Sequence, residues 1–556
     1  MFILLFLCGL AVTQAQNLQV NTTEGWIVGN IASNGVYHVF YGIPYAGPAA
    51  PTPPSRYPGL FHAMDSNIIC AQPSANGLIG IENCLTLSIY TNNVTTPKPV
   101  VVWLNAEEYT TSSTTLYSFR RFIEEGIVVV SMNFRLSIFG FLCLGVPEAP
   151  GNAGLKDVIQ GLNWIKTNIA GFGGNPNNVA LFGHGSAAAI VDLITISPRA
   201  QNLVHKAVAL SGSALAPWAV AYDPAGYANI LGEKLSYNGK SRSELAKLLI
   251  STDINVLGSA LNGFKFTNNT PLFAPCIEDK NLNANETVLT DAPINLLRAG
   301  NYSHIPYIAG YVNREGTLRA EEAAFDQWRV KMQNNFTDFL QVDLDFGTNR
   351  TAMAQSIRDF YFSGSPNNLD IEDYLDYHGD TLVLVSVIRG ARERAATSRS
   401  EVRLLEFAYM GTLNSDWSYH EIPLKGVKHG GLLNYMFDFD LRPADEAIMR
   451  SVVKRLATFA HVGSPVITGN PTIEWPAISN DRLYYLYYSG NTLERMDGPN
   501  TTSVEQPKFD PHSTKMTFWN PIYSSSYKAP VPVSSARRVV GFLYVCVFSI
   551  IFVRLF

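Results

Sequence analysis

The chain lacks a basic stripe. Its 41 lysines and arginines are scattered along 556 residues, and the formal net charge is -5. Proteins that bind nucleic acids gather positive charge on one face or along one helix, so we exclude a nucleic-acid partner. The chain also lacks an internal repeat that would indicate a solenoid or another repeated array.

Cysteine is scarce, with only six residues. Cys8 lies in an apolar run at the N-terminus and Cys546 in another at the C-terminus, so four cysteines remain for the folded part. Cys143 and Cys276 either form a disulfide with each other or remain free buried thiols. The sequence does not choose between these two states.

The first residues read as a targeting segment rather than as part of the fold. Residues 1–15 are an apolar run that ends in small residues, with Thr13 and Ala15 in the positions of a cleavage site. We therefore predict a signal peptide and entry into the secretory pathway, where disulfides form. The chain also carries N-x-S/T sequons, and we predict glycosylation of Asn21, Asn93, Asn268, Asn285, Asn301, Asn335, Asn349 and Asn500.

The other end of the chain has the composition of a membrane anchor. Residues 524–538 are small, polar and proline-containing, which predicts a linker, and residues 539–556 form a hydrophobic tail. Its apolar part is short for the roughly 30 Å of a bilayer core. We expect a GPI-attachment signal, with a short membrane anchor as the alternative. Either anchor would hold the protein at the extracellular face of the plasma membrane.

Between these ends, residues 16–523 have the pattern of one large α/β domain. Hydrophobic residues make up 47% of the chain, enough for a large core. The run KPVVVWLN at 98–105 is typical of a buried parallel strand. The stretch 179–198 predicts a strand, a sharp glycine turn and a helix that opens with small residues.

Several motifs in one register resemble the type-B carboxylesterase/cholinesterase family. They are FYGIPYAGP, IENCLTLSIY, NFRLSIFGFL, PGNAGLKDVIQGLNWIKTNIAGFGGNP and VALFGHGSAAA, in that order. The resemblance covers about residues 20–520. It implies an α/β-hydrolase fold with a large, mostly parallel central sheet flanked by helices, no cofactor and no metal. It also implies a disulfide between Cys70 and Cys84.

The resemblance places a catalytic triad that is incomplete. Its acid falls on Glu315 and its base on His429, but its nucleophile falls on Gly185, which has no side chain to attack a carbonyl. Ser186 is next in sequence and is a candidate off-register nucleophile. Using it would put His184 where the tight turn requires glycine, so the alternative interpretation is a serine that caps the following helix.

The oxyanion hole is also altered. The family has a glycine-rich motif after the strand at 98–105, and its N–H groups bind the developing negative charge. Here the aligned residues are Ala106, Glu107 and Glu108. Two carboxylates would repel an oxyanion, so this change and the change at Gly185 point independently to lost catalysis.

Three functions therefore stay open from the sequence. The first is a catalytically inactive, glycosylated, membrane-anchored relative that binds a protein partner or a lipophilic ligand, similar to the neuroligin, neurotactin, gliotactin and glutactin group. The second is a carboxylesterase that uses Ser186. The third is a surface protein that holds hydrophobic esters without turning them over. The resemblance also makes a homodimer plausible.

Overall fold

The computed structural model describes residues 18–533, apart from 34–35, 48–53, 75–76, 113–116, 262–265, 268, 283–285, 325–326, 364–368, 415–417, 420–421, 424, 438–442, 468–472 and 491–504. The signal peptide at 1–15 and the tail at 539–556 lie outside the described residues. So do three predicted glycosylation sites, Asn268, Asn285 and Asn500. The other five sequon asparagines are exposed, as glycosylation requires.

An eleven-stranded sheet forms the centre of the molecule, in the order β20-β19-β16-β15-β12-β11-β9-β10-β8-β4-β3. Its seven middle strands, from β19 to β10, run parallel, and antiparallel pairs occur at both edges. The strands are β1 (Gln19–Thr22), β2 (Gly25–Val28), β3 (Asn30–Ile31), β4 (His38–Pro44), β5 (Phe61–His62), β6 (Gln72–Ser74), β7 (Gly77–Ile79), β8 (Thr86–Thr91), β9 (Lys98–Leu104), β10 (Val128–Met132), β11 (Gly174–His184), β12 (Lys206–Leu210), β13 (Phe266–Thr267), β14 (Thr270–Pro271), β15 (Tyr307–Val312), β16 (Val402–Phe407), β17 (Ser418–Tyr419), β18 (Ile422–Pro423), β19 (Tyr484–Tyr488) and β20 (Glu505–Phe509).

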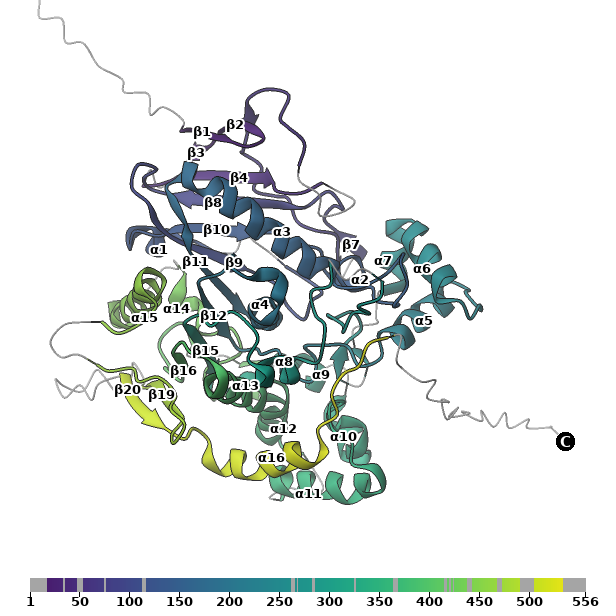
Figure 1. Ribbon diagram of the computed structural model, residues 1–556. Helices are drawn as coiled ribbons and strands as arrows, with labels where there is room; N and C mark the ends of the chain where they lie inside the picture. Colours follow the sequence, from purple (N-terminus) through teal and green to yellow (C-terminus); the bar gives the residue numbers. More distant parts are fainter. Residues whose placement is uncertain are drawn as a thin grey trace, which may run out of the picture.

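Helices cover both faces of this sheet (Figure 1). They are α1 (Arg120–Glu124), α2 (Ser137–Phe141), α3 (Ala153–Asn168), α4 (Ser186–Ile196), α5 (Pro224–Lys234), α6 (Arg242–Ser251), α7 (Ile254–Leu261), α8 (Pro293–Ala299), α9 (Ala320–Ala324), α10 (Trp328–Asn334), α11 (Arg350–Phe362), α12 (Ile371–Gly379), α13 (Val385–Thr397), α14 (Leu433–Met436), α15 (Pro443–Val462) and α16 (Ser513–Ser526). The predicted α/β fold with a mostly parallel sheet is confirmed.

Strand β9 shows why its sequence is an unbroken apolar run. Val100, Val102 and Leu104 point into the core shared with α3, α4 and α13. Val101 and Trp103 point into the opposite core, shared with α1, α14 and α15. Because successive side chains of a strand alternate between faces, a strand covered on both sides needs apolar residues at every position.

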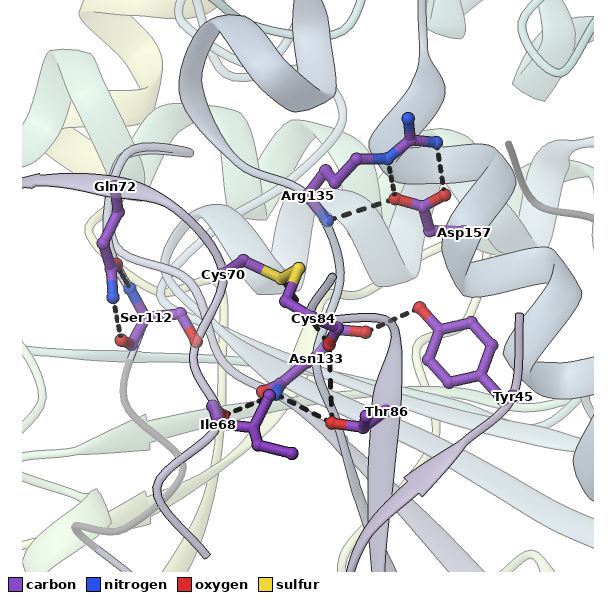
Figure 2. The surroundings of a disulfide bond; sticks show 10 residues. All are labelled: Tyr45, Ile68, Cys70, Gln72, Cys84, Thr86, Ser112, Asn133, Arg135 and Asp157. Atoms are coloured by element: carbon purple, nitrogen blue, oxygen red, sulfur yellow. Dashed lines mark hydrogen bonds and ion pairs between the residues drawn. A yellow bond between two sulfur atoms is a disulfide. The ribbon is translucent and has the colours of Figure 1, made fainter. Parts of the chain in front are cut away.

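The predicted disulfide between Cys70 and Cys84 is confirmed. Figure 2 shows it beside Asn133, whose side-chain amide donates to the Ile68 carbonyl and to the Thr86 hydroxyl. These bonds tie the disulfide loop to the end of β10. The loop therefore lies against the sheet as part of its edge.

Cys143 and Cys276 form a second disulfide, which settles the choice that the sequence left open. The two residues are 133 positions apart in sequence, and both are buried. The pair joins the segment after α2 to the segment before α8. Two buried disulfides are typical of a protein that folds in an oxidising compartment.

The segment after α16 packs along the domain. The Lys528 N–H donates to the Asp343 carbonyl, and the Arg242 guanidinium donates to the Val533 carbonyl at 3.0 Å. In Figure 1 this yellow segment runs from α16 up to the neighbourhood of α5. Residues 524–533, which the sequence assigns to a linker, are thus part of the folded domain. No helix among the residues described between 18 and 533 is long and apolar enough to cross a membrane.

Asp343 makes this C-terminal contact sensitive to pH. Burial raises the pKa of Asp343 to about 7, and the attraction of Arg389 opposes that rise only in part. Since its unfolded pKa is near 3.9, the folded state is most favoured below about pH 4 and loses stability as the pH rises through about 7.

We therefore expect Asp343→Asn to raise the free energy of unfolding at pH 8 by on the order of 2–4 kcal/mol and to change little at pH 4. Thermal melts of both proteins at the two pH values measure the difference. An equal shift at both pH values would show that the effect does not come from ionisation of this carboxyl.

Candidate functional site

The strand–turn–helix unit at Gly185 keeps the shape of a nucleophile elbow. β11 ends at His184 and α4 begins at Ser186, while Gly185 between them has φ 59° and ψ -125°. Glycine adopts this conformation readily, and other residues do so only with strain. Gly212 packs so tightly on the turn that a Cβ there would lie 2.1 Å from the Gly185 carbonyl oxygen. The sharp turn is therefore intact although its serine is missing.

The base and the acid of the triad are together. His429 Nδ1 lies 2.5 Å from Glu315 Oε2, and the other oxygen of Glu315 accepts from the Val312 N–H at 2.8 Å. The Thr317 hydroxyl accepts from the His429 N–H at 2.8 Å. The Glu315 carboxylate is thus held from two sides and orients the imidazole of His429, while the Thr317 bond holds the backbone of His429.

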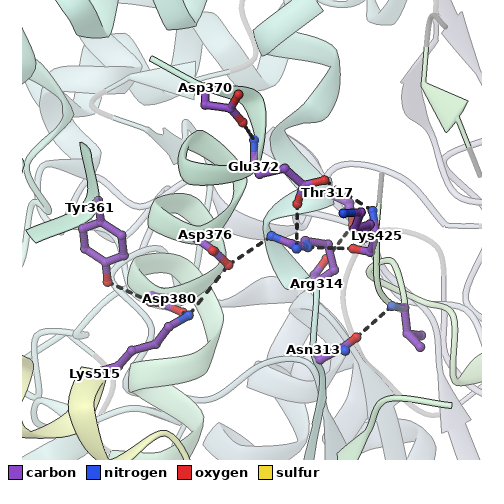
Figure 3. Close-up of polar contacts among 11 residues, drawn as sticks. Asn313, Arg314, Thr317, Tyr361, Asp370, Glu372, Asp376, Asp380, Lys425 and Lys515 are labelled. Carbon is purple, nitrogen blue, oxygen red and sulfur yellow. Dashed lines mark hydrogen bonds and ion pairs between the residues drawn. The ribbon is translucent and has the colours of Figure 1, made fainter. Parts of the chain in front are cut away.

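Backbone contacts hold the acid loop and the base loop in register. The Asn313 side chain accepts from the Val427 N–H, and the Arg314 guanidinium donates to the Lys425 carbonyl. Figure 3 shows Arg314 reaching also to Glu372 and Asp376 on α12. The pair is therefore built into the scaffold and does not depend on a bound substrate.

The position of the missing nucleophile can be located directly. A Cβ added to Gly185 would lie 3.5 Å from His429 Nε2, the nitrogen that would take a proton from a serine. The same Cβ would lie 3.5 Å from a carboxylate oxygen of Glu107. His429 Nε2 and Glu107 Oε1 are 3.6 Å apart. In this chain the carboxylate of Glu107 therefore faces the base where a serine hydroxyl would.

Ser186 is engaged elsewhere. Its hydroxyl donates to the Ala106 carbonyl at 2.8 Å and accepts from the Tyr109 N–H at 2.9 Å. The side chain is buried, and both bonds lead to the segment after β9, away from His429. The structure thus places Ser186 as a link between α4 and that segment, which itself carries Glu107 against His429.

The segment of the expected oxyanion hole uses its N–H groups internally. The Glu107 N–H donates to the Thr111 carbonyl at 2.7 Å, and the Tyr109 N–H is taken by Ser186. Glu108 and Tyr109 have φ values of 50° and 60°, so they keep the left-handed backbone that glycine normally provides. The Glu108 carboxylate forms an ion pair with the buried Arg319. The loop shape is kept, but the charge in it is negative.

Comparison with known proteins agrees with this geometry. A sequence model described as "Carboxylesterase family" matches residues 16–506. The chain belongs to the carboxylesterase family. It is 27% identical over 538 residues to venom carboxylesterase-6 of Apis mellifera, covering 89% of this chain and 95% of that protein. It is also 27% identical over 527 residues to bile salt-activated lipase of Homo sapiens, covering 86% of this chain and 67% of the lipase.

Among solved structures, juvenile hormone esterase from Manduca sexta, with OTFP covalently attached, matches with a TM-score of 0.79 and 23% identity. The match covers 92% of this chain and all of that one. The carboxylesterase fold is therefore kept along almost the whole chain.

In the altered site, His429 and the neighbouring carboxylates shift the pKa values of one another. Burial disfavours the charged form of His429, but Glu315 and Glu107 outweigh it and raise its pKa to about 10. Burial also acts to raise the pKa of Glu107, yet the hydrogen bond and charge of His429 hold it below its usual value. At neutral pH His429 is thus a charged imidazolium beside the carboxylates of Glu107 and Glu315. A protonated His429 cannot act as a general base.

Two further residues belong to the site and were given no role by sequence reasoning. The ring of His184 lies 4.5 Å from that of His429, and burial together with the charge of His429 lowers the pKa of His184 to about 4. Arg319 pairs with Glu108 across a sequence separation of 211 residues. The position of His184 directly before the turn at Gly185 could have identified it as a site residue from the sequence. No local sequence pattern identifies Arg319.

The cavity in front of this site is small. Among the described residues, the space open to the centre of a water molecule is about 20 Å³. That volume holds one water or one ion and no ester. The lining residues are Glu107, Glu108, Gly185, Ser186, Trp218, Pro271, Leu318, Arg319, Val383 and His429.

Proposed function

We propose that this member of the carboxylesterase family does not hydrolyse esters and acts by binding a protein partner outside the cell. The observation that carries the proposal is the combination of two changes at the site, a glycine at position 185 and the carboxylate of Glu107. The elbow has no nucleophile, and a carboxylate faces His429 in its place. Both changes remove interactions that an acyl transfer needs, namely a nucleophile and a site for the oxyanion.

The small cavity favours a protein partner over the lipophilic ligand or ester sink. A drug-sized ligand needs a pocket of about 300–1,000 Å³, far more than the space at this site. A protein partner needs only the outer surface. We further propose that the chain is displayed on the cell surface as a glycoprotein, with its C-terminal tail serving as a GPI-attachment signal as first choice and as a short membrane anchor as the alternative.

Lack of esterase chemistry is tested with a fluorophosphonate probe and with short-chain aryl esters. The wild-type protein and a His429→Ala variant are compared, with an active family esterase as a positive control. We expect no labelling, and turnover equal to that of the variant. Stoichiometric labelling that maps to Ser186 would contradict the proposal and favour the off-register esterase.

Partner binding is tested with fluorescent, multivalent protein applied to cells. The expected result is saturable binding that is lost after the cells are treated with trypsin, because a protein partner is then removed. Binding that survives trypsin and is matched by protein-free lipid vesicles would contradict a protein partner and favour a lipophilic ligand.

A further inference from the structure

Three side chains at the altered site converge in a way that no part of the proposed function uses. Glu107, His184 and His429 each present a metal-ligating atom, and these atoms all lie within 4.8 Å of one another. His429 Nε2 and Glu107 Oε1 are 3.6 Å apart. Two ligands of a tetrahedral zinc ion are about 3.3 Å apart when each bond is about 2.0–2.1 Å. Small side-chain rotations would bring all three to bonding distance.

We propose that Glu107, His184 and His429 bind one divalent transition-metal ion, with Zn²⁺ as the best fit. Two imidazoles and one carboxylate are a set of ligands that holds zinc in enzymes and leaves a fourth position open. The cavity beside Glu107 and His429 has room for one water at that position. Hard cations such as Mg²⁺ prefer oxygen ligands, so the two imidazoles disfavour them.

The environment of His184 is a second, independent observation that points to a bound ion. It is buried, with 7% of its surface exposed, and its Nε2 has no hydrogen-bond partner. A buried polar atom without a partner costs free energy, on the order of 1–3 kcal/mol. An ion coordinated through Nε2 of His184 would satisfy this nitrogen and remove that cost.

The surroundings of the three ligands also fit an ion. His429 Nδ1 is bonded to Glu315, and a second carboxylate behind a ligating histidine is the usual way to orient it. With neutral imidazoles, the carboxylates of Glu107, Glu108 and Glu315 and the guanidinium of Arg319 sum to a charge of about -2. A ligating imidazole nitrogen must be unprotonated, so metal binding releases to solvent any proton that this nitrogen carries.

The same two substitutions that remove the esterase chemistry create this site. Gly185 leaves open the space that a serine side chain would fill, since its Cβ would lie 3.5 Å from both His429 Nε2 and Glu107 Oε2. Glu107 then brings a carboxylate to that space in place of a glycine. The side chain of Glu107 is half exposed, which gives an ion a path from solvent.

Metal binding is tested on the full-length chain, purified without a metal-affinity tag and stripped with a chelator. Co²⁺ is titrated while visible absorption is recorded, and Zn²⁺ is then added in competition. We expect one Co²⁺ per chain with the visible bands of a tetrahedral site, and loss of those bands when Zn²⁺ displaces the cobalt. A folded protein that binds neither ion would overturn the proposal.

Variants locate the site. Glu107→Gln and His184→Gln should each weaken binding by at least about 100-fold, and Glu315→Gln by about 10–100-fold, as expected for a residue that orients a ligand. His461→Gln and Glu124→Gln change exposed residues outside the site and should leave affinity unchanged. Equal affinities in all five variants would place the ion elsewhere and contradict the assignment. If His184→Gln does not fold, Glu107→Gln decides alone, because its side chain is half exposed.

Discussion

Replacing Gly185 with serine alone is expected to leave the protein without esterase activity above the level of a His429→Ala control. Its Cβ would meet only ordinary contacts of 3.5 Å or more, although the φ of 59° strains any residue other than glycine. The new side chain would face the Glu107 carboxylate and a protonated His429 that cannot accept its proton. The N–H groups of Glu107 and Tyr109 would still be bonded to Thr111 and Ser186.

Adding Glu107→Gly to Gly185→Ser should then raise turnover of an aryl ester by at least about 100-fold over the single variant. Removal of the carboxylate lowers the pKa of His429 toward the range of a general base, whose catalysis is worth about 10²–10⁴-fold, and it removes a charge that would repel an oxyanion. Steady-state hydrolysis of 4-nitrophenyl butyrate measures both variants. Robust turnover in the single variant would show that Glu107 does not block the reaction.

The largest loss of stability is expected from Arg394→Met. Arg394 donates to Asp192 at 2.6 Å, and both side chains are almost fully buried. Asp192 lies inside α4, where it also accepts from the Ala214 N–H at 2.8 Å. Removing one partner of a buried pair leaves the other charge unpaired, so we expect a loss of about 3–5 kcal/mol.

Arg298→Met is the matched control for this change. Arg298 also pairs with a carboxylate, Glu393 on α13, but 61% of its side-chain surface is exposed. Exposed pairs contribute about 0–1 kcal/mol. Urea midpoints of both variants measure the difference. Similar shifts would mean that burial of the Asp192 pair adds nothing to its strength.

The elements near the sheet centre could be predicted from sequence because their signals are local. The apolar run at 99–104 is typical of a strand covered on both faces, and the glycines around Gly185 indicate a tight turn. The Cys70–Cys84 disulfide followed from family motifs around closely spaced residues.

What the sequence could not predict depends on contacts between distant segments. Cys143 and Cys276 are brought together only by the complete fold, and so are Glu108 and Arg319. The polar composition of 524–533 is typical of a linker, yet hydrogen bonds such as that from the Arg242 guanidinium to the Val533 carbonyl hold it on the domain. The hydropathy pattern of the sequence does not reveal hydrogen bonds of this kind, because they do not require apolar side chains.

The C-terminal segment packed on the domain limits how far the domain can lie from a membrane. If the tail from Val539 stays in the chain as a short membrane anchor and is not removed as a GPI signal, only residues 534–538 separate it from the last residue held on the domain. A fully extended chain of that length reaches about 20 Å. A membrane-held protein would then stand with the side that carries Val533 close to the lipid. The opposite side would be the one presented to a neighbouring cell.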